Sequence, residues 1–198
     1  MLEDAIASYD KALEFKPDDH AAWYNRGVAL GKLGRLEEAI ASYDKALEFK
    51  PDKHEAWYSL GVSLYSLGRL EDAIASYDKA LEFKPDKHEA WYNRGGALYK
   101  LGRFEDVIAS YDKALEIKPD YHEAWYNRGI TLGNLSTLEV LNNWPLGQVN
   151  IERFKDAIAS YDKALAFKPD KDKAWYNIKH LRFIISLAFM RYIVKWME

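Results

Sequence analysis

The sequence predicts an all-α fold in which short helix pairs stack side by side into an array. The block AIASYDKALEFKPD starts at Ala5 and recurs at Ala39 and Ala73, and close variants of it start at Val107 and Ala157. The first three steps are 34 residues long and the last is 50. A unit of this length holds two helices but cannot bury its own apolar face, so neighbouring units must stack.

The composition excludes several classes of function. The 198 residues include no cysteine, which excludes disulfides, zinc–thiolate sites and cysteine nucleophiles and is compatible with the cytoplasmic location that we expect. A net charge of −3 argues against nucleic-acid binding, which would need a basic face to displace counterions. The sequence has neither a glycine-rich phosphate loop nor a Ser/His/Asp grouping, so we expect no enzyme and no cofactor.

Residues 1–19 are predicted to form a half repeat, which is the second helix of a unit without its first. Apolar residues recur at helical spacing from Ala5 to Leu13, and Pro17 ends the helix. A chain that starts in this way is also compatible with a fragment of a larger multidomain protein.

Residues 20–171 are predicted to form four complete repeats. Each of the first three has a first helix that ends at a glycine, such as Gly34, and a second helix that ends before a proline, such as Pro51. The spacing of Asp52 and Glu55 predicts a capping box at the start of the next first helix.

The repeated residues resemble the tetratricopeptide repeat family over residues 1–177. In one unit the family pattern is carried by Trp57, Gly61, Leu64, Ala73, Tyr77, Ala80 and Pro85. The resemblance implies a right-handed α-solenoid of antiparallel helix pairs, the tetratricopeptide repeat superhelix. We expect Gly61 and Ala73 to leave room for two helices to approach closely.

The fourth repeat carries a 16-residue insert near 136–152. No glycine follows Leu135, so the first helix is predicted to continue through Leu138 for about two turns, roughly 12 Å. Asn142 and Asn143 should end it, and the second helix should restart near Asn150. Trp144 and Leu146 in the insert either contact a partner or cover the apolar end of the longer helix.

Residues 172–198 are predicted to form a C-terminal first helix that caps the array. Lys179 stands where the other units have glycine, which should block a following second helix. This helix can cap the fourth repeat, associate with a second copy, or lie on a membrane. We favour capping with self-association, because the charges surround the helix and do not form one basic face. The residues for self-association are Phe183, Ile184, Leu187, Tyr192 and Trp196.

The resemblance implies a concave groove, lined by the first helices, that holds a peptide or a partner helix. Tyrosine and asparagine suit this role, since one gives rigid contact area and the other bonds a peptide backbone. The alternative is that these side chains are solvated surface. The expected groove residues are Tyr24, Asn25, Val28, Tyr58, Ser59, Val62, Tyr65, Tyr92, Asn93, Tyr99, Tyr126, Asn127 and Ile130.

One ligand mode known in the family is incomplete in this chain. Relatives that grip the C-terminal carboxylate of chaperones use lysine and asparagine on successive first helices, but tyrosines such as Tyr24 and valines such as Val28 occupy those places. Arg26, Arg94 and Arg128 replace a common leucine. We expect them to be partly buried and paired with Asp10, Asp78 and Asp112.

The chain offers weak candidates for metal binding or catalysis. Four histidines recur one unit apart, which is too far for convergence on one ion at metal-ligand distances of about 2 Å. Acidic pairs such as Glu37 and Glu38 lie at the start of second helices, where they favour the helix dipole. The sequence therefore predicts a non-catalytic protein–protein interaction scaffold. The alternative is a structural module that assembles as a dimer or head to tail.

Overall fold

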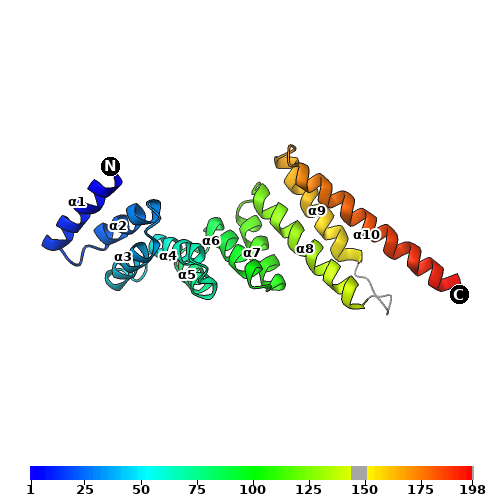
Figure 1. Ribbon diagram of the computed structural model, residues 1–198, viewed down its shortest axis with the longest axis horizontal. Helices are drawn as coiled ribbons and strands as arrows, with labels where there is room; N and C mark the ends of the chain where they lie inside the picture. The colour runs from blue at the N-terminus through cyan, green and yellow to red at the C-terminus, as the bar shows by residue number, and fades with distance from the viewer. Residues whose placement is uncertain (144–150, 198) are drawn as a thin grey trace. The chain divides into compact units, whose positions relative to one another are not determined.

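The structure is a computed structural model that describes the backbone of residues 1–143 and 151–197, with side chains described for 1–139 and 151–187. Every regular element in these ranges is an α-helix, which confirms the predicted all-α class. The chain divides into two compact units, residues 1–101 and 102–198, and each is described separately below. Figure 1 shows the order of the helices within each unit.

The first unit contains one second-type helix, then two helix pairs with short turns, and then one further first-type helix. First-type helices bury small residues and leucine, such as Ala56 and Leu64, and second-type helices bury Ala73 and Tyr77. This division explains why neither helix is stable alone and why the pair is the packing unit. The helices are α1 (Leu2–Phe15), α2 (His20–Lys32), α3 (Leu36–Phe49), α4 (His54–Ser66), α5 (Leu70–Phe83) and α6 (His88–Lys100).

The turn within each pair is formed by a glycine in the left-handed region, as predicted. Gly34 has a φ of 76°, and its N–H donates to the carbonyl oxygen of Gly31 while that of Arg35 donates to Leu30. This pair of bonds is a Schellman motif, which satisfies carbonyl groups at the end of α2. A residue with a Cβ would be strained at this position.

The capping box predicted from Asp52 and Glu55 was wrong. The N-cap of α4 is Lys53, with no side-chain hydrogen bond, because the turn ends one residue after Asp52. Asp52 instead pairs with Lys50 at 3.1 Å. The carboxylate of Asp19, at the start of α2, does cap its helix and accepts hydrogen bonds from two backbone N–H groups.

A tryptophan near the start of each first helix fixes the preceding turn. The Nε1–H of Trp57 donates to the carbonyl oxygen of Pro51 at 2.8 Å, and Trp23 makes the same bond to Pro17. The proline ends the previous second helix and offers its carbonyl to the indole, which determines where the next first helix begins.

A glycine inside the first helices α2 and α4 receives an aromatic ring. A Cβ built on Gly61 would lie 2.6 Å from Cε1 of Tyr77, and one built on Gly27 would lie equally close to Tyr43. The glycine therefore gives room to a tyrosine ring, which refines the expectation that it only allows two backbones to approach. Tyr77 is 1% exposed, so this contact lies in the core.

The second unit contains α7 (Phe104–Ile117), α8 (His122–Asn143), α9 (Ile151–Phe167) and α10 (Asp172–Met197). The first helix of the fourth repeat continues to Asn143, and the next helix starts at Ile151, as predicted from the missing glycine. An ion pair between Arg153 and Glu139 joins α9 to the added part of α8.

The insert leaves the pairing of α8 with α9 in the register of the shorter repeats. A Cβ on Gly129 would lie 2.8 Å from Cε1 of Tyr161, like its counterparts in the first unit. Helix α10 then packs on α9 through Ala174, Ile178 and Leu181, all at most 5% exposed. Through these residues α10 covers one side of α9.

Candidate functional site

In the first unit, the predicted groove residues lie on α2, α4 and α6, and none of them is buried. Asn25 and Val62 are exposed, and the others are partly exposed. The opposite faces of the same helices fill the core. The three first helices therefore present a polar and aromatic face, several of whose rings pack against the core on one side and remain open to solvent on the other.

Lysines and one asparagine hold the tyrosine rings of this face. The Nζ of Lys53 lies 4.7 Å from the ring centre of Tyr24, and Lys87 lies 4.5 Å from Tyr58. The Nδ2 of Asn93 donates to the hydroxyl of Tyr58 at 2.9 Å. Burial raises the pKa of the Tyr58 hydroxyl above its ordinary value. Such restraints lower the entropy lost when a ligand contacts the rings.

In the second unit, the three predicted groove residues lie on α8. Tyr126 lies under the Nζ of Lys171 at 3.9 Å from its ring centre, and the backbone carbonyl of Asn127 accepts a hydrogen bond from Thr131. Ile130 forms part of a hollow that the sequence alone did not predict.

This hollow has a volume of about 580 Å³ and lies between α8 and α10, with one ring from α9 and one from α7. Gly133 leaves space for it where the second and third repeats have Tyr65 and Tyr99, although the first repeat also has a glycine, Gly31, and α8 continues past its usual end. The lining residues on α8 follow helical spacing. The lining consists of Phe104, Ile130, Gly133, Asn134, Thr137, Leu138, Tyr161, Asn177, His180 and Leu181.

The lining of the hollow includes no lysine, arginine, aspartate or glutamate among the described residues. Leu181 and Tyr161 are buried at its floor, whereas Asn134, Leu138 and His180 are exposed. The Nδ2 of Asn177 donates to the Tyr161 hydroxyl at 3.2 Å. An apolar floor with a neutral polar rim suits an uncharged group. The loss of tyrosine at Gly133 was the sequence signal for this hollow.

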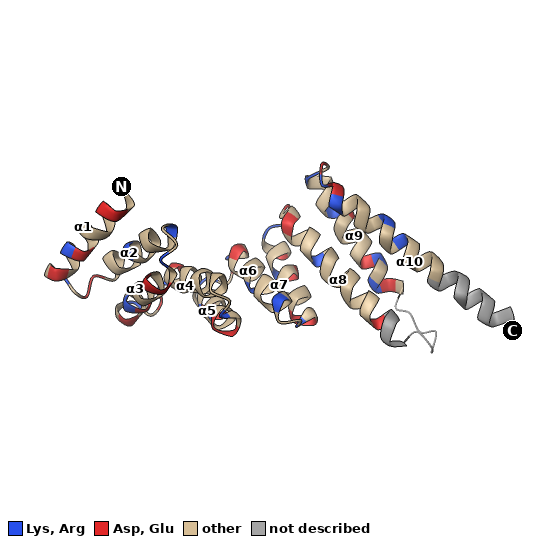
Figure 2. Cartoon of the chain, in the orientation of Figure 1, with Lys and Arg blue, Asp and Glu red and all other residues tan. Residues whose placement is uncertain are grey.

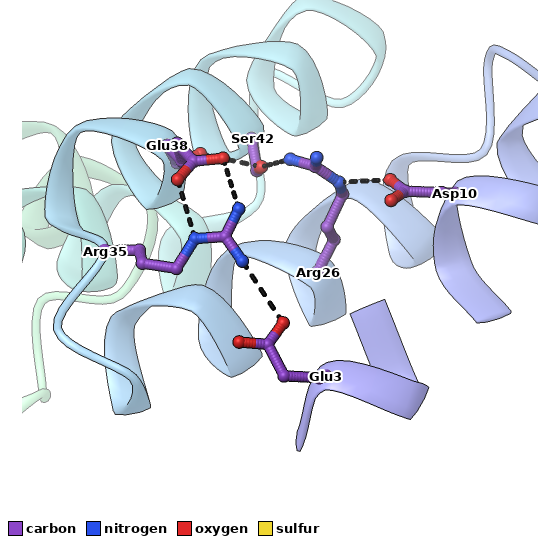
Figure 3. A network of polar contacts seen from close by, with 6 residues as sticks. All are labelled: Glu3, Asp10, Arg26, Arg35, Glu38 and Ser42. Atoms are coloured by element: carbon purple, nitrogen blue, oxygen red, sulfur yellow. Dashed lines mark hydrogen bonds and ion pairs between the residues drawn. The ribbon is translucent and has the colours of Figure 1, made fainter. Parts of the chain in front are cut away.

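The arginines predicted to be partly buried are paired as expected. The Nε of Arg26 lies 2.6 Å from Oδ1 of Asp10, and its side chain is 19% exposed. Its Nη1 also donates to the hydroxyl of Ser42, as Figure 3 shows. Arg94 with Asp78 and Arg128 with Asp112 repeat the ion pair at the same distance. These arginines connect second helices to the following first helices, so they are structural and not free anion ligands.

The histidines lie at the first position of four helices and show no convergence. His54 has its nearest carboxylate on the adjacent Glu55, at 3.6 Å, and His122 similarly faces Glu123. Within the part of the chain that the structure describes, no group of three or more histidines, cysteines and acids could hold a metal ion. The same residues include no helix that is long and apolar enough to cross a membrane.

The residues predicted for self-association differ in their surroundings. Phe183 is 59% exposed and Leu187 is 39% exposed, whereas Ile184 packs partly on the core of the second unit. The side chains of Tyr192 and Trp196, like Trp144 and Leu146 of the insert, lie outside the described residues.

Comparison with known proteins gives one family. A model described as TPR repeat matches residues 2–34 and 63–102. Two models described as tetratricopeptide repeat match 20–53 with 88–121 and 42–75 with 110–143. None of the curated proteins in the comparison matches the chain.

Solved structures show the same fold. A crystal structure of MamA aligns with 87% of this chain and 91% of its own, at 22% identity and a TM-score of 0.73. YrrB, described as a TPR protein with an unusual peptide-binding site, aligns over 90% of this chain and 84% of its own, at 26% identity and a TM-score of 0.71. The first TPR of Spaghetti (RPAP3), bound to the HSP90 peptide SRMEEVD, aligns over 59% of this chain and 92% of its own, at 22% identity and a TM-score of 0.57.

Proposed function

Because the chain belongs to the tetratricopeptide repeat family, we propose that it is a non-catalytic protein-interaction scaffold that binds a peptide or helix on its first-helix face. The observation that carries the proposal is the unburied face of α2, α4 and α6. Its tyrosines pack against the core with one side only, and lysines and Asn93 orient the partly exposed rings.

The chemistry of this face favours a polar or acidic peptide over a purely apolar one. Ordered phenol rings give contact area at low entropic cost, and Asn25 and Asn93 can bond a peptide backbone. Lys100 lies beside the ring of Tyr65 and adds positive charge, whereas Lys53 and Lys87 also lie 3.8 Å from Glu55 and Glu89. The two-carboxylate clamp for chaperone C-termini is not proposed, because its lysine and asparagine positions hold tyrosine and valine.

The test is quantitative capture of partners from native lysate, followed by calorimetry with the peptide that the captured protein supplies. The groove variant combines Tyr58→Ala, Tyr92→Ala and Asn93→Ala. A second groove variant, Asn25→Lys with Val62→Glu, changes only exposed side chains and so leaves the core intact.

The matched control changes exposed residues of second helices, Lys45→Ala and Lys79→Ala, and circular dichroism verifies that each variant is folded. We expect both groove variants to lose the captured partner, with peptide affinity reduced at least tenfold by the lost stacking and hydrogen bonds, on the order of 1.4 kcal/mol or more. Identical capture by all variants would show that this face is not the site.

A further inference from the structure

The outer face of α10 is exposed at positions that are buried or partly buried in the other first helices of the described chain. In α4 the five equivalent positions are all less exposed: Gly61 and Leu64 are buried, and Trp57, Tyr58 and Tyr65 are partly buried. In α10 all five are exposed, and they are Trp175, Tyr176, Lys179, Arg182 and Phe183.

The exposure is large for three aromatic rings on one helix face. Trp175 is 50% exposed, Tyr176 is 70% exposed and Phe183 is 59% exposed. The four earlier tryptophans donate their indole N–H to a proline carbonyl at 2.8–2.9 Å, and Trp175 makes no such bond within the described residues. Contiguous exposed aromatic area of this kind marks interaction surfaces.

At two positions of this face, α10 has residues that differ from those on which a second helix packs in the other repeats. Lys179 replaces the glycine that receives a tyrosine ring in other first helices. Even a Cβ alone, built on the equivalent Gly61, would lie 2.6 Å from Tyr77. Arg182 replaces the apolar Leu64, which is 4% exposed in α4. A second-type helix with the usual tyrosine, such as α1 of another copy, therefore cannot dock here as α5 docks on α4.

The charge of the surface indicates what can dock. Residues 172–187 contain three lysines or arginines and one acid, although the whole chain has a net charge of −3. Figure 2 shows these basic bands on the described part of α10. Two copies of α10 would repel each other, whereas an acidic helix would be attracted and its charges paired.

We propose that the outer face of α10, comprising Trp175, Tyr176, Lys179, Arg182 and Phe183, binds an acidic amphipathic helix of a partner protein. The helix lies as α5 lies on α4, with a carboxylate in place of the Tyr77 ring, where it pairs with Lys179. Its apolar residues cover the three aromatic rings. This surface is separate from the first-helix face of the first unit and does not depend on the function proposed for it.

The probe is a fluorescein-labelled peptide with the sequence of α5, Leu70–Phe83, held helical by a lactam bridge on its solvent side. Three versions are compared by fluorescence anisotropy: Tyr77→Glu, unchanged Tyr77 and Tyr77→Lys. We expect the glutamate version to bind the complete chain, with an affinity that falls as salt rises. The other two versions should bind at least tenfold more weakly.

The protein variants are Lys179→Glu with Arg182→Glu, and Phe183→Ser, all at exposed positions that should not affect folding. Each should reduce affinity for the glutamate peptide about tenfold or more. Lys163→Glu, on the exposed side of α9, is the matched control and should leave affinity unchanged. Tyr58→Ala should also leave it unchanged, which separates this proposal from that for the first-helix face.

Several results would overturn the proposal. Equal binding of the three peptides would show nonspecific apolar adsorption, and absence of binding would show that the face accepts no such helix. Light scattering that shows a dimer abolished by Lys179→Glu would assign the face to a second copy. Unchanged affinity in the charge-reversal variant would exclude Lys179 and Arg182 from any contact.

Discussion

The close contact between Gly61 and Tyr77 gives the sharpest stability prediction. In Gly61→Ala the new Cβ would lie 2.6 Å from Cε1 and 2.8 Å from Cδ1 of a ring that is 1% exposed. The ring is rigid and enclosed, so either α4 or α5 must shift. Overpacking of this size costs about 1–3 kcal/mol.

Gly96→Ala is a matched control within the same unit. Gly96 is also inside a first helix, but a Cβ there would meet only the hydroxyl oxygen of Tyr65, at 3.9 Å. Both substitutions gain about 0.5–1 kcal/mol from reduced backbone entropy in a helix. Gly96→Ala should therefore stabilise the chain, and Gly61→Ala should be about 1–3 kcal/mol less stable than Gly96→Ala, because only it has the clash.

The assay is urea unfolding followed by circular dichroism, with midpoints compared at a shared m-value. A double variant isolates the ring: in a Tyr77→Leu background, Gly61→Ala should become as favourable as Gly96→Ala. If Gly61→Ala alone stabilises the chain as much as Gly96→Ala does, the tight glycine–tyrosine contact is not an energetic constraint.

The remaining predictions concern an ion pair, a buried phenol and a turn. Arg26→Leu should change the free energy of unfolding by less than about 1 kcal/mol, because Leu60 fills the equivalent place in α4. Arg26→Ala should lower it by about 1–2 kcal/mol, because the packing of the arginine over Trp23 is lost. Urea denaturation compares the two variants. Burial raises the pKa of Tyr43 to about 12 from 10.0. The neutral phenol therefore stabilises the fold below pH 10, and this contribution is lost as the pH rises from 10 to 12. In Tyr43→Phe the free energy of unfolding should fall less between pH 9 and pH 11 than it does in the unchanged chain. Gly68→Ala should cost about 1 kcal/mol by the same assay, because φ is 77° there.

The architecture was readable from the sequence because the repeat supplies many copies of each local signal. The spacing of Arg26 and Asp10 predicted an ion pair that the structure forms, since residues 16 apart fall on facing helices in every repeat. The capping box failed because the spacing of Asp52 and Glu55 is only local. It could not show that the turn extends to Lys53.

Two surfaces could not be read from the repeat pattern. The hollow beside Gly133 requires the position of Leu181 on α10, whose Cδ2 would lie 3.4 Å from a Cβ at 133, and no periodicity reports a contact between helices so far apart in the chain. The exposed face of α10 follows from which positions α5 covers on α4. The sequence indicated that Lys179 breaks the pattern and that Phe183 belongs to an apolar surface, but not that Trp175 and Tyr176 lie exposed beside them.

The junction between α8 and α9 has a practical consequence. Arg128 bonds Ser160 at 2.7 Å across 32 residues, just as Arg26 bonds Ser42 at 2.7 Å across 16. The added length therefore leaves this contact between the two helices unchanged, although Glu139 within it pairs with Arg153 of α9. A reporter domain or an affinity tag inserted at this junction should therefore be tolerated without disturbing the neighbouring repeats.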